Sequence, residues 1–80
     1  MQVRLRFFAS LRERLGTGMV RSLRQGTTAG EAWEALARET PALRAMRVRF
    51  AVNEHYVDPG HRLADGDELA VFPPVSGGSP

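Results

Sequence analysis

The chain has 80 residues, of which 42% are apolar and 25% charged, and its formal net charge is +2. A chain of this length forms one small domain with a thin core, which disfavours a self-contained enzyme with a deep pocket of its own. Cysteine is absent, so disulfides, thiolate metal sites and a cysteine nucleophile are excluded. No apolar stretch approaches the ~20 residues that span a bilayer, and Arg4 and Arg6 interrupt the apolar N-terminus where a secretory signal needs a continuous run. We therefore expect a cytoplasmic protein with no membrane partner.

Residues 2–9 form the first predicted strand, because apolar and polar positions alternate with the period of two that half-buried strands show. The positions predicted to face the core are Val3, Leu5 and Phe7. Residues 10–15 then favour a short helical turn with Ser10 as N-cap and Glu13 as its capping partner, ended by Gly16 and Gly18. Residues 19–23 predict a second strand that returns beside the first.

Residues 28–40 carry the clearest helix signal. The apolar positions recur at the spacing of one helix face, and they are Ala29, Ala32, Trp33, Leu36 and Ala37. Thr28 and Glu31 have the spacing of a capping box, and Pro41 ends the segment. Trp33 lies on the apolar stripe, so we interpret it as a core residue between helix and sheet rather than as a ligand platform.

Three further strands are predicted, at residues 47–52, around residues 56–57 and at residues 68–72, with turn sequences at 58–60 and 65–67 between them. In the first of these strands the inward positions are Val48, Phe50 and Val52, and the outward positions are Arg47, Arg49 and Ala51.

The predicted order is strand, strand, helix, strand, short strand, strand. One helix can cover only one face of a sheet, so we expect an α+β fold with a mixed sheet of four to five strands and one main helix packed on one face. The β-grasp arrangement fits this order. In it the first and last strands lie side by side and parallel, a pairing that needs the intervening crossover.

Two large aromatic residues fall at strand positions that are predicted to face away from the core. Phe8 shares the outward register of Arg4 and Arg6, and Phe72 shares that of Glu68 and Ala70. Parallel first and last strands would place both rings at one end of the open face, where paired aromatics mark a contact surface. The alternative is a local twist that tucks one ring into the core.

The C-terminal residues are the strongest functional signal. We expect a β-grasp domain over residues 1–74 and a flexible tail over residues 75–80. Pro73 and Pro74 stiffen the exit from the last strand. Gly77 and Gly78 then give a backbone without side chains that can thread a narrow channel. The alternative for the tail is an ordinary frayed terminus.

Other chemistry-bearing residues give weak signals. His55, Asp58 and His61 are too few and too loosely spaced to predict a metal site. The run Asp65-Gly66-Asp67 before a strand is an ordinary turn. The arginines at positions 44, 47 and 49 have the spacing of solvated positions without interleaved aromatic residues, so we expect no nucleic-acid partner.

Three stretches carry a family resemblance: FFASLRE at residues 7–13, AVN at residues 51–53 and LADGDELAVFPPVSGG at residues 63–78. Through them the chain resembles the small subunit of molybdopterin synthase (the MoaD type), a ubiquitin-like sulfur carrier, over nearly its whole length. The third stretch is the most specific, because it combines the acidic turn, the final strand, FPPV and the double glycine in the family's order. That family has the β-grasp fold.

The resemblance implies a non-catalytic, sulfur-carrying subunit of a synthase complex, with no cofactor bound by the chain itself. An adenylyltransferase similar to ubiquitin-activating enzymes would use ATP to activate the carboxylate of Gly78, and a sulfur donor would convert it to a thiocarboxylate. The large synthase subunit would receive the tail, with Gly77 giving clearance, and sulfur would pass to the pyranopterin precursor of the molybdenum cofactor. The positions placed in partner contact are Phe8, Arg12, Tyr56, Phe72, Pro73, Pro74 and Val75.

Ser79 and Pro80 depart from the family pattern, in which the chain generally stops at the double glycine. Adenylation needs a free carboxylate on Gly78. Three explanations stay open: a protease trims the two residues, the protein is a relative with another role, or the two residues are incidental.

Two alternative functions also stay open. The same tail would serve a carrier that feeds thiazole, cysteine or tRNA thiolation, although FPPVSGG and FFASLRE favour the pterin route. A different class is a ubiquitin-like protein modifier or interaction module, whose tail would be joined to other proteins through an isopeptide bond.

Overall fold

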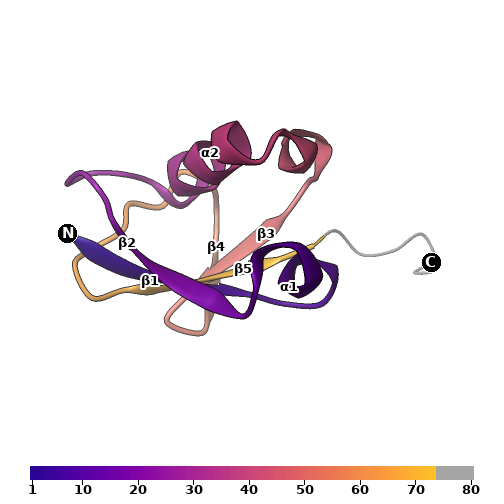
Figure 1. Ribbon diagram of the computed structural model, residues 1–80. Helices are drawn as coiled ribbons and strands as arrows, with labels where there is room; N and C mark the ends of the chain where they lie inside the picture. Colours follow the sequence, from indigo (N-terminus) through magenta and orange to yellow (C-terminus); the bar gives the residue numbers. More distant parts are fainter. Residues whose placement is uncertain (74–80) are drawn as a thin grey trace.

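The computed structural model describes residues 1–73. Their elements, in chain order, are β1 (Gln2–Phe7), α1 (Ser10–Leu15), β2 (Gly18–Ser22), α2 (Ala29–Glu39), the 3-10 helix η1 (Pro41–Ala45), β3 (Arg49–Val52), β4 (His55–Val57) and β5 (Glu68–Phe72). The five strands form one sheet in the order β2-β1-β5-β3-β4, and α2 lies across one face of it (Figure 1).

The centre of the sheet is the parallel pair β1 and β5, in which Leu5 lies opposite Leu69 and Phe7 opposite Val71. The other three pairings, β1 with β2, β3 with β4 and β3 with β5, are antiparallel. A parallel pair cannot be joined by a hairpin, and here the chain between its two strands supplies β2, α2, β3 and β4. The prediction of an α+β β-grasp fold with one main helix is confirmed.

The core lies between α2 and the sheet and follows the predicted alternation. On β1, Val3, Leu5 and Phe7 are at most 1% exposed while the residues between them are open to solvent. Trp33 on α2 is 7% exposed and packs in the same cluster, which confirms its prediction as a core residue. Leu43 on η1 is fully buried there too, although the sequence did not predict this 3-10 helix.

The N-terminus of α2 is fixed by its own cap and by a distant loop. The Thr28 hydroxyl accepts a hydrogen bond from the Glu31 amide at 3.1 Å, and the Glu31 carboxylate accepts one from the Thr28 amide at 2.9 Å, as a capping box requires. The next two amides donate to the loop before β5: Ala29 to the His61 carbonyl at 2.9 Å and Gly30 to the Pro59 carbonyl at 2.8 Å. The predicted capping box is therefore confirmed.

The start of α1 corrects the prediction. The N-cap is Ala9, with φ of 53°, and no side chain caps the helix, so Ser10 is its first helical residue and not its cap. The reason is tertiary: Leu11 is fully buried, and placing it in the core starts the helix one residue earlier than the sequence indicated. This turn also ends β1 at Phe7 rather than at residue 9.

Two other predicted boundaries shift. Gly16, with φ of 84°, does end α1, but Gly18 begins β2 and passes so close to β1 that an added Cβ would lie 2.6 Å from the Leu5 carbonyl oxygen. The third strand begins at Arg49 rather than at residue 47, because η1 extends to Ala45 and residues 46–48 are irregular.

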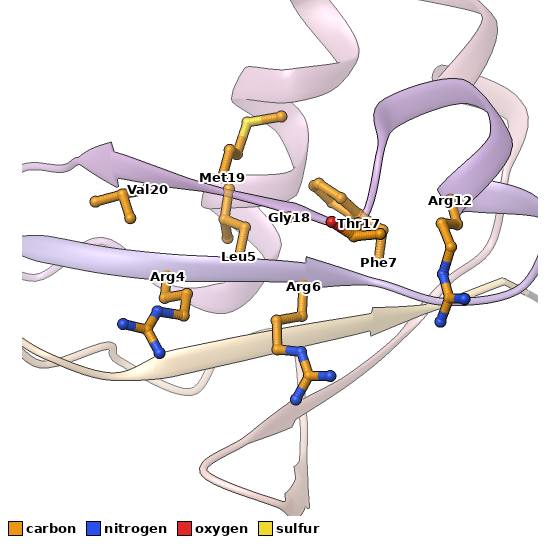
Figure 2. A pocket seen from close by; sticks show the side chains of 9 residues that line it. All are labelled: Arg4, Leu5, Arg6, Phe7, Arg12, Thr17, Gly18, Met19 and Val20. Carbon is orange, nitrogen blue, oxygen red and sulfur yellow. The ribbon is translucent and has the colours of Figure 1, made fainter.

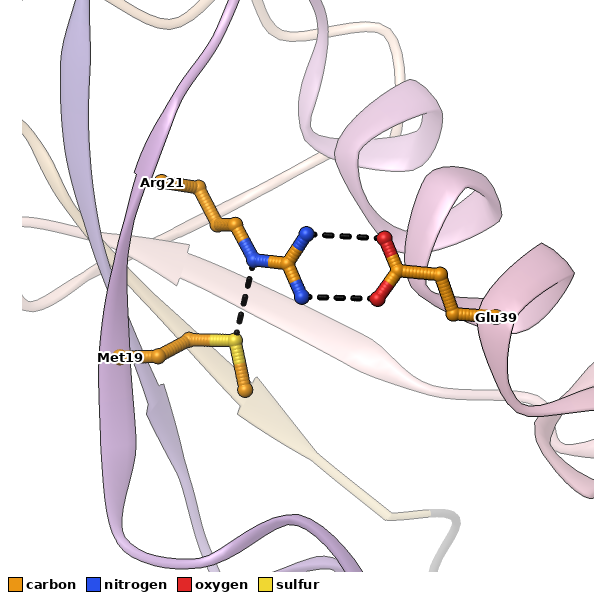
Figure 3. Close-up of polar contacts among 3 residues, drawn as sticks. All are labelled: Met19, Arg21 and Glu39. Atoms are coloured by element: carbon orange, nitrogen blue, oxygen red, sulfur yellow. Dashed lines mark hydrogen bonds and ion pairs between the residues drawn. The ribbon is translucent and has the colours of Figure 1, made fainter.

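The edge strand β2 is tied to the far end of α2 by one ion pair (Figure 3). Two nitrogens of the Arg21 guanidinium each donate to one Glu39 carboxylate oxygen at 2.8 Å, and the third donates to the Met19 sulfur at 3.3 Å. The bidentate geometry gives this contact a fixed orientation that a single ion pair lacks.

Within residues 1–73 the longest helix is α2, with 11 residues, and none of the helices there combines the length and apolarity needed to cross a membrane.

Candidate functional site

The sheet face opposite α2, here called the open face, is built by the residues that alternate with the core. Strand register aligns its side chains in rows, since directly opposed residues project to the same side. One row joins Arg6 to Ala70 on β5, Ala70 to Ala51 on β3, and Ala51 to Tyr56 on β4. Figure 1 shows α2 on one side of the sheet only, and this row faces the other side.

Three aromatic rings gather at one end of the open face, and we call them the aromatic cluster: Phe8, Tyr56 and Phe72. The rings of Phe8 and Phe72 stack with centroids 4.7 Å apart and an interplanar angle of 13°. Tyr56 tilts toward Phe72 at 47°, with centroids 5.9 Å apart. Neither phenylalanine belongs to the core, so the pairing of Phe8 and Phe72 on the open face is confirmed and a ring tucked into the interior is excluded.

The cluster frames a shallow hollow of about 310 Å³. Its floor is Ala51 and Ala70, which are only 5% and 9% exposed although they face outward. Ala51 was predicted to point outward and does so, but small side chains between large rings are screened from water. The rim residues are Arg6, Phe8, Glu54, Tyr56, Glu68 and Phe72.

Exposure and charge are distributed over the hollow as in a protein interface. Tyr56 is 73% exposed and is the most exposed aromatic side chain of the cluster. The Arg6 guanidinium lies 5.3 Å from the centroid of the Phe8 ring and 3.6 Å from a Glu68 carboxylate oxygen. An apolar centre of aromatic rings with a charged rim is the usual anatomy of a docking site.

The hollow lies where the chain leaves the sheet. Phe72 is the last residue of β5, and Pro73, which follows it, is half-buried. Pro74, Val75, Gly77 and Gly78 lie outside the described residues, and so does the predicted boundary between domain and tail at residue 74. Their assigned roles therefore stay predictions.

Of the predicted contact residues in the described part, Arg12 and Pro73 do not line the hollow. Pro73 directly follows Phe72, whereas Arg12 is distant in the chain from the end of β5. It lies on α1 and lines a second groove along β1 and the start of β2 (Figure 2). The structure thus brings together Phe8, Tyr56 and Phe72 and places Arg12 apart from them.

Sequence reasoning missed the floor and the charged rim of the hollow. The alternation along β3 and β5 gives the outward orientation of Ala51 and Ala70, and with the β-grasp strand order it could have placed them side by side. Glu54 follows Asn53 in a turn where both have positive φ, and no sequence pattern signalled its position on the rim. Within residues 1–73, no three His, Asp or Glu side chains are grouped closely enough to hold a metal ion.

Comparisons with known proteins agree with this architecture. The chain matches the ThiS family over residues 5–78. It is 41% identical over 85 residues to the molybdopterin synthase sulfur carrier subunit of Escherichia coli, covering 95% of this chain and 99% of that protein.

Two further proteins are similar in structure as well as in sequence. Small archaeal modifier protein 1 of Haloferax volcanii is 37% identical over 84 residues, covering 91% of this chain and 97% of that protein. Its crystal structure superposes with a TM-score of 0.79 at 31% identity, covering 98% of this chain and all of the other. A solved complex contains subunits 1 and 2 of the molybdopterin-converting factor from Helicobacter pylori. One of its chains superposes with a TM-score of 0.63 at 28% identity, covering 98% of this chain and 100% of the other.

Proposed function

The chain belongs to the ThiS family, and from this premise we propose that it is a ubiquitin-like sulfur carrier of the molybdopterin synthase type. The observation that carries the proposal is the position of the aromatic cluster at the end of β5, six residues before Gly78. A carrier needs a docking surface next to a segment that ends in glycine after trimming. All catalytic side chains can then belong to its partners.

The chemistry requires a leaving group, since a carboxylate is a poor acyl donor. In the proposed sequence the Gly78 carboxylate attacks the α-phosphorus of ATP on an adenylating partner and displaces pyrophosphate. Sulfide (HS⁻) then attacks the acyl carbon, AMP leaves, and the thiol proton is lost, which gives a thiocarboxylate. The large synthase subunit takes up this end of the chain, and the sulfur passes to the pyranopterin precursor of the molybdenum cofactor.

The hollow supports docking on energetic grounds. Aromatic residues in the centre of an interface commonly dominate binding, and the stacked pair of Phe8 and Phe72 presents a rigid apolar surface that loses little side-chain entropy on binding. From Phe72 to Gly78 a fully extended chain spans at most about 20 Å, so a partner that binds the cluster must hold its reactive groups within that distance.

Gly78 is followed by Ser79, so its carbonyl is part of a peptide bond in the printed sequence. We therefore include a processing step in the proposal: a protease hydrolyses the bond between Gly78 and Ser79 and frees the carboxylate. Without this cleavage Gly78 has no carboxylate for the adenylating partner to activate.

The test is intact-mass spectrometry on two matched forms, one ending at Gly78 and one that retains Ser79 and Pro80. Each is incubated with the adenylating partner, ATP, Mg²⁺ and sulfide. The form ending at Gly78 should gain about 16 Da, the exchange of oxygen for sulfur, and the longer form should gain nothing. A sulfur gain by the longer form in the absence of cleavage, or no gain by the shorter one, would contradict the proposal.

A protein modifier is the second candidate, favoured by the similarity to small archaeal modifier protein 1. The activated Gly78 would then be attacked by a lysine amine of a target and not by sulfur. Covalent attachment to target lysines without any sulfur gain would establish this role. A sulfur gain that supports thiazole, cysteine or tRNA thiolation but not pterin sulfuration would instead assign the chain to another carrier route.

A further inference from the structure

A second groove lies on β1 and β2 and shares Arg6 with the hollow at the aromatic cluster. It has a volume of about 490 Å³, and we call it the arginine groove. Its lining residues are Arg4, Leu5, Arg6, Phe7, Arg12, Thr17, Gly18, Met19 and Val20. The proposed sulfur chemistry assigns no role to Arg4 or Val20, so the function of this surface is a separate question.

Three guanidinium groups project to one side of the sheet at this groove. Figure 2 shows the side chains of Arg4, Arg6 and Arg12 pointing the same way, while Leu5 and Met19 point to the opposite side. All three arginines are exposed. The groove is therefore an array of cations from two elements, β1 and α1, and not a chance pair of neighbours on one strand.

Two of these cations have no acidic partner within the part of the chain that the structure describes. Among residues 1–73 the ion pairs within 4.0 Å are those of Arg6 with Glu68 and of Arg21 with Glu39, so neither Arg4 nor Arg12 is in one. Glu68 lies opposite Arg4 on β5 and forms the ion pair with Arg6, so one carboxylate faces three guanidinium groups. An excess of like charge raises the local potential and attracts anions.

Between the arginines the groove is open and carries one exposed apolar side chain, that of Val20. Gly18, opposite Arg6, contributes no side chain, and Val20, opposite Arg4, is 61% exposed. Leu5 and Phe7 are each 1% exposed, so they contribute main chain to the floor and not side-chain walls. The exposed Val20 side chain lines the same groove as Arg4 and Arg12, which form no ion pair within residues 1–73. This combination fits a segment that carries both carboxylates and an aliphatic side chain.

The neighbouring strand edge adds a second reason for an extended partner. β2 is at the end of the sheet order, so one side of it has no strand partner within the described residues. Such an edge offers backbone N–H and C=O groups to an added strand. A nucleic acid fits the groove less well, because single strands bind where bases can stack on aromatic faces and the one aromatic residue lining it, Phe7, is buried.

We propose that the arginine groove binds an extended acidic segment of a partner protein, with carboxylates on Arg4 and Arg12 and an aliphatic side chain on Val20. The inference stands independently of the sulfur-carrier proposal, since this binding needs neither ATP nor sulfide nor a free Gly78.

The probe is a capped peptide of two glutamates, a central leucine and two aspartates, titrated into the ¹⁵N-labelled full chain at low salt. Amide resonances of Gly18, Met19 and Val20 should shift most. The double variant Arg4→Gln/Arg12→Gln should weaken binding about five- to tenfold, the size expected for two exposed ion pairs. The matched control is Arg44→Gln/Arg47→Gln, which removes the same charge from exposed positions outside the groove and should change affinity less than about twofold.

Four results would overturn the proposal. They are equal weakening by the two double variants, shifts centred on the aromatic cluster, equal binding of the peptide in which amides replace all four carboxylates, and tighter binding of a thymidine decamer than of the acidic peptide at the same salt concentration. The variant Val20→Thr should lower affinity without changing its salt dependence, and an unchanged affinity would remove the aliphatic contact from the account.

Discussion

The two faces of the sheet are made by alternate residues of the same strands, yet they have opposite properties. On β1, Leu5 is 1% exposed under α2, whereas Arg4 and Arg6 on either side of it are exposed on the open face. The covered face is closed by apolar packing within residues 1–73. The open face instead carries an aromatic cluster, a charged rim and two arginines without acidic partners in that part of the chain. One set of positions therefore forms the core, and the other forms the surface that we propose binds partners.

The largest effect should come from the covered face. Leu5→Ala removes a buried side chain next to Leu69 and should lower the free energy of unfolding by about 2–5 kcal/mol. The matched change on the open face, Arg4→Ala, should stay within about 0.5 kcal/mol. Urea unfolding followed by circular dichroism measures both. Similar losses for the two variants would show that the faces are not separable.

Phe72→Ala should act mainly on binding. Loss of a central aromatic anchor should weaken the complex with the large synthase subunit by about 2 kcal/mol, or about thirtyfold. The free energy of unfolding should fall by only about 1 kcal/mol, because the ring stacks on Phe8 outside the core. Calorimetric titration and thermal unfolding of the same preparation give the two numbers. Unchanged partner affinity with a large drop in melting temperature would make Phe72 a structural residue.

Removing the side-chain cap of α2 should have a smaller effect, and it should change stability alone. Thr28→Ala removes the acceptor of the Glu31 amide and should cost about 1 kcal/mol of stability. Partner affinity should not change, since Thr28 lies far along the chain from the cluster and on the helix side of the sheet. Thr28→Ser is the control and should retain most of the stability. A loss of partner affinity without a loss of stability would contradict the separation of the two faces into a fold-forming face and a binding face.

The smallest effect concerns the ion pair between β2 and α2. The hydrogen bonds from the Arg21 guanidinium lower the pKa of the Glu39 carboxyl from its ordinary value. A lowered pKa in the folded state means that the pair stabilises the protein above the ordinary carboxyl range and loses this contribution as the pH falls through the lowered pKa. The effect is small because Glu39 is exposed. Glu39→Gln should therefore melt slightly below the parent at neutral pH and equal to it in acid; a gap that persists in acid would rule out titration of Glu39 as its cause.

Much of the covered face could be predicted from the sequence because its signals are local. Alternation on β1 and the spacing of Thr28 with Glu31 each act within a few residues, and the structure has both as predicted. The cap of α1 could not be predicted in this way. Ser10 has the residue type of a cap, but the burial of Leu11 places the N-cap at Ala9 in spite of its positive φ, and Ser10 is the first helical residue.

The open face was predictable only in part, because its site is made between strands. Phe8 and Phe72 could be paired once the first and last strands were taken as parallel neighbours. The position of Tyr56 beside Phe72 depends on the register of β3 with both β4 and β5, which no single stretch of sequence encodes. The arginine groove likewise depends on α1 placing Arg12 near the side chains of β1.

The most direct measurement is the intact mass of the protein purified from its own cells. We expect a species that ends at Gly78, with part of it heavier by about 16 Da as the thiocarboxylate. If every molecule instead retained Ser79 and Pro80 and none carried additional sulfur, the role of this chain as a donor of sulfur from Gly78 would be contradicted.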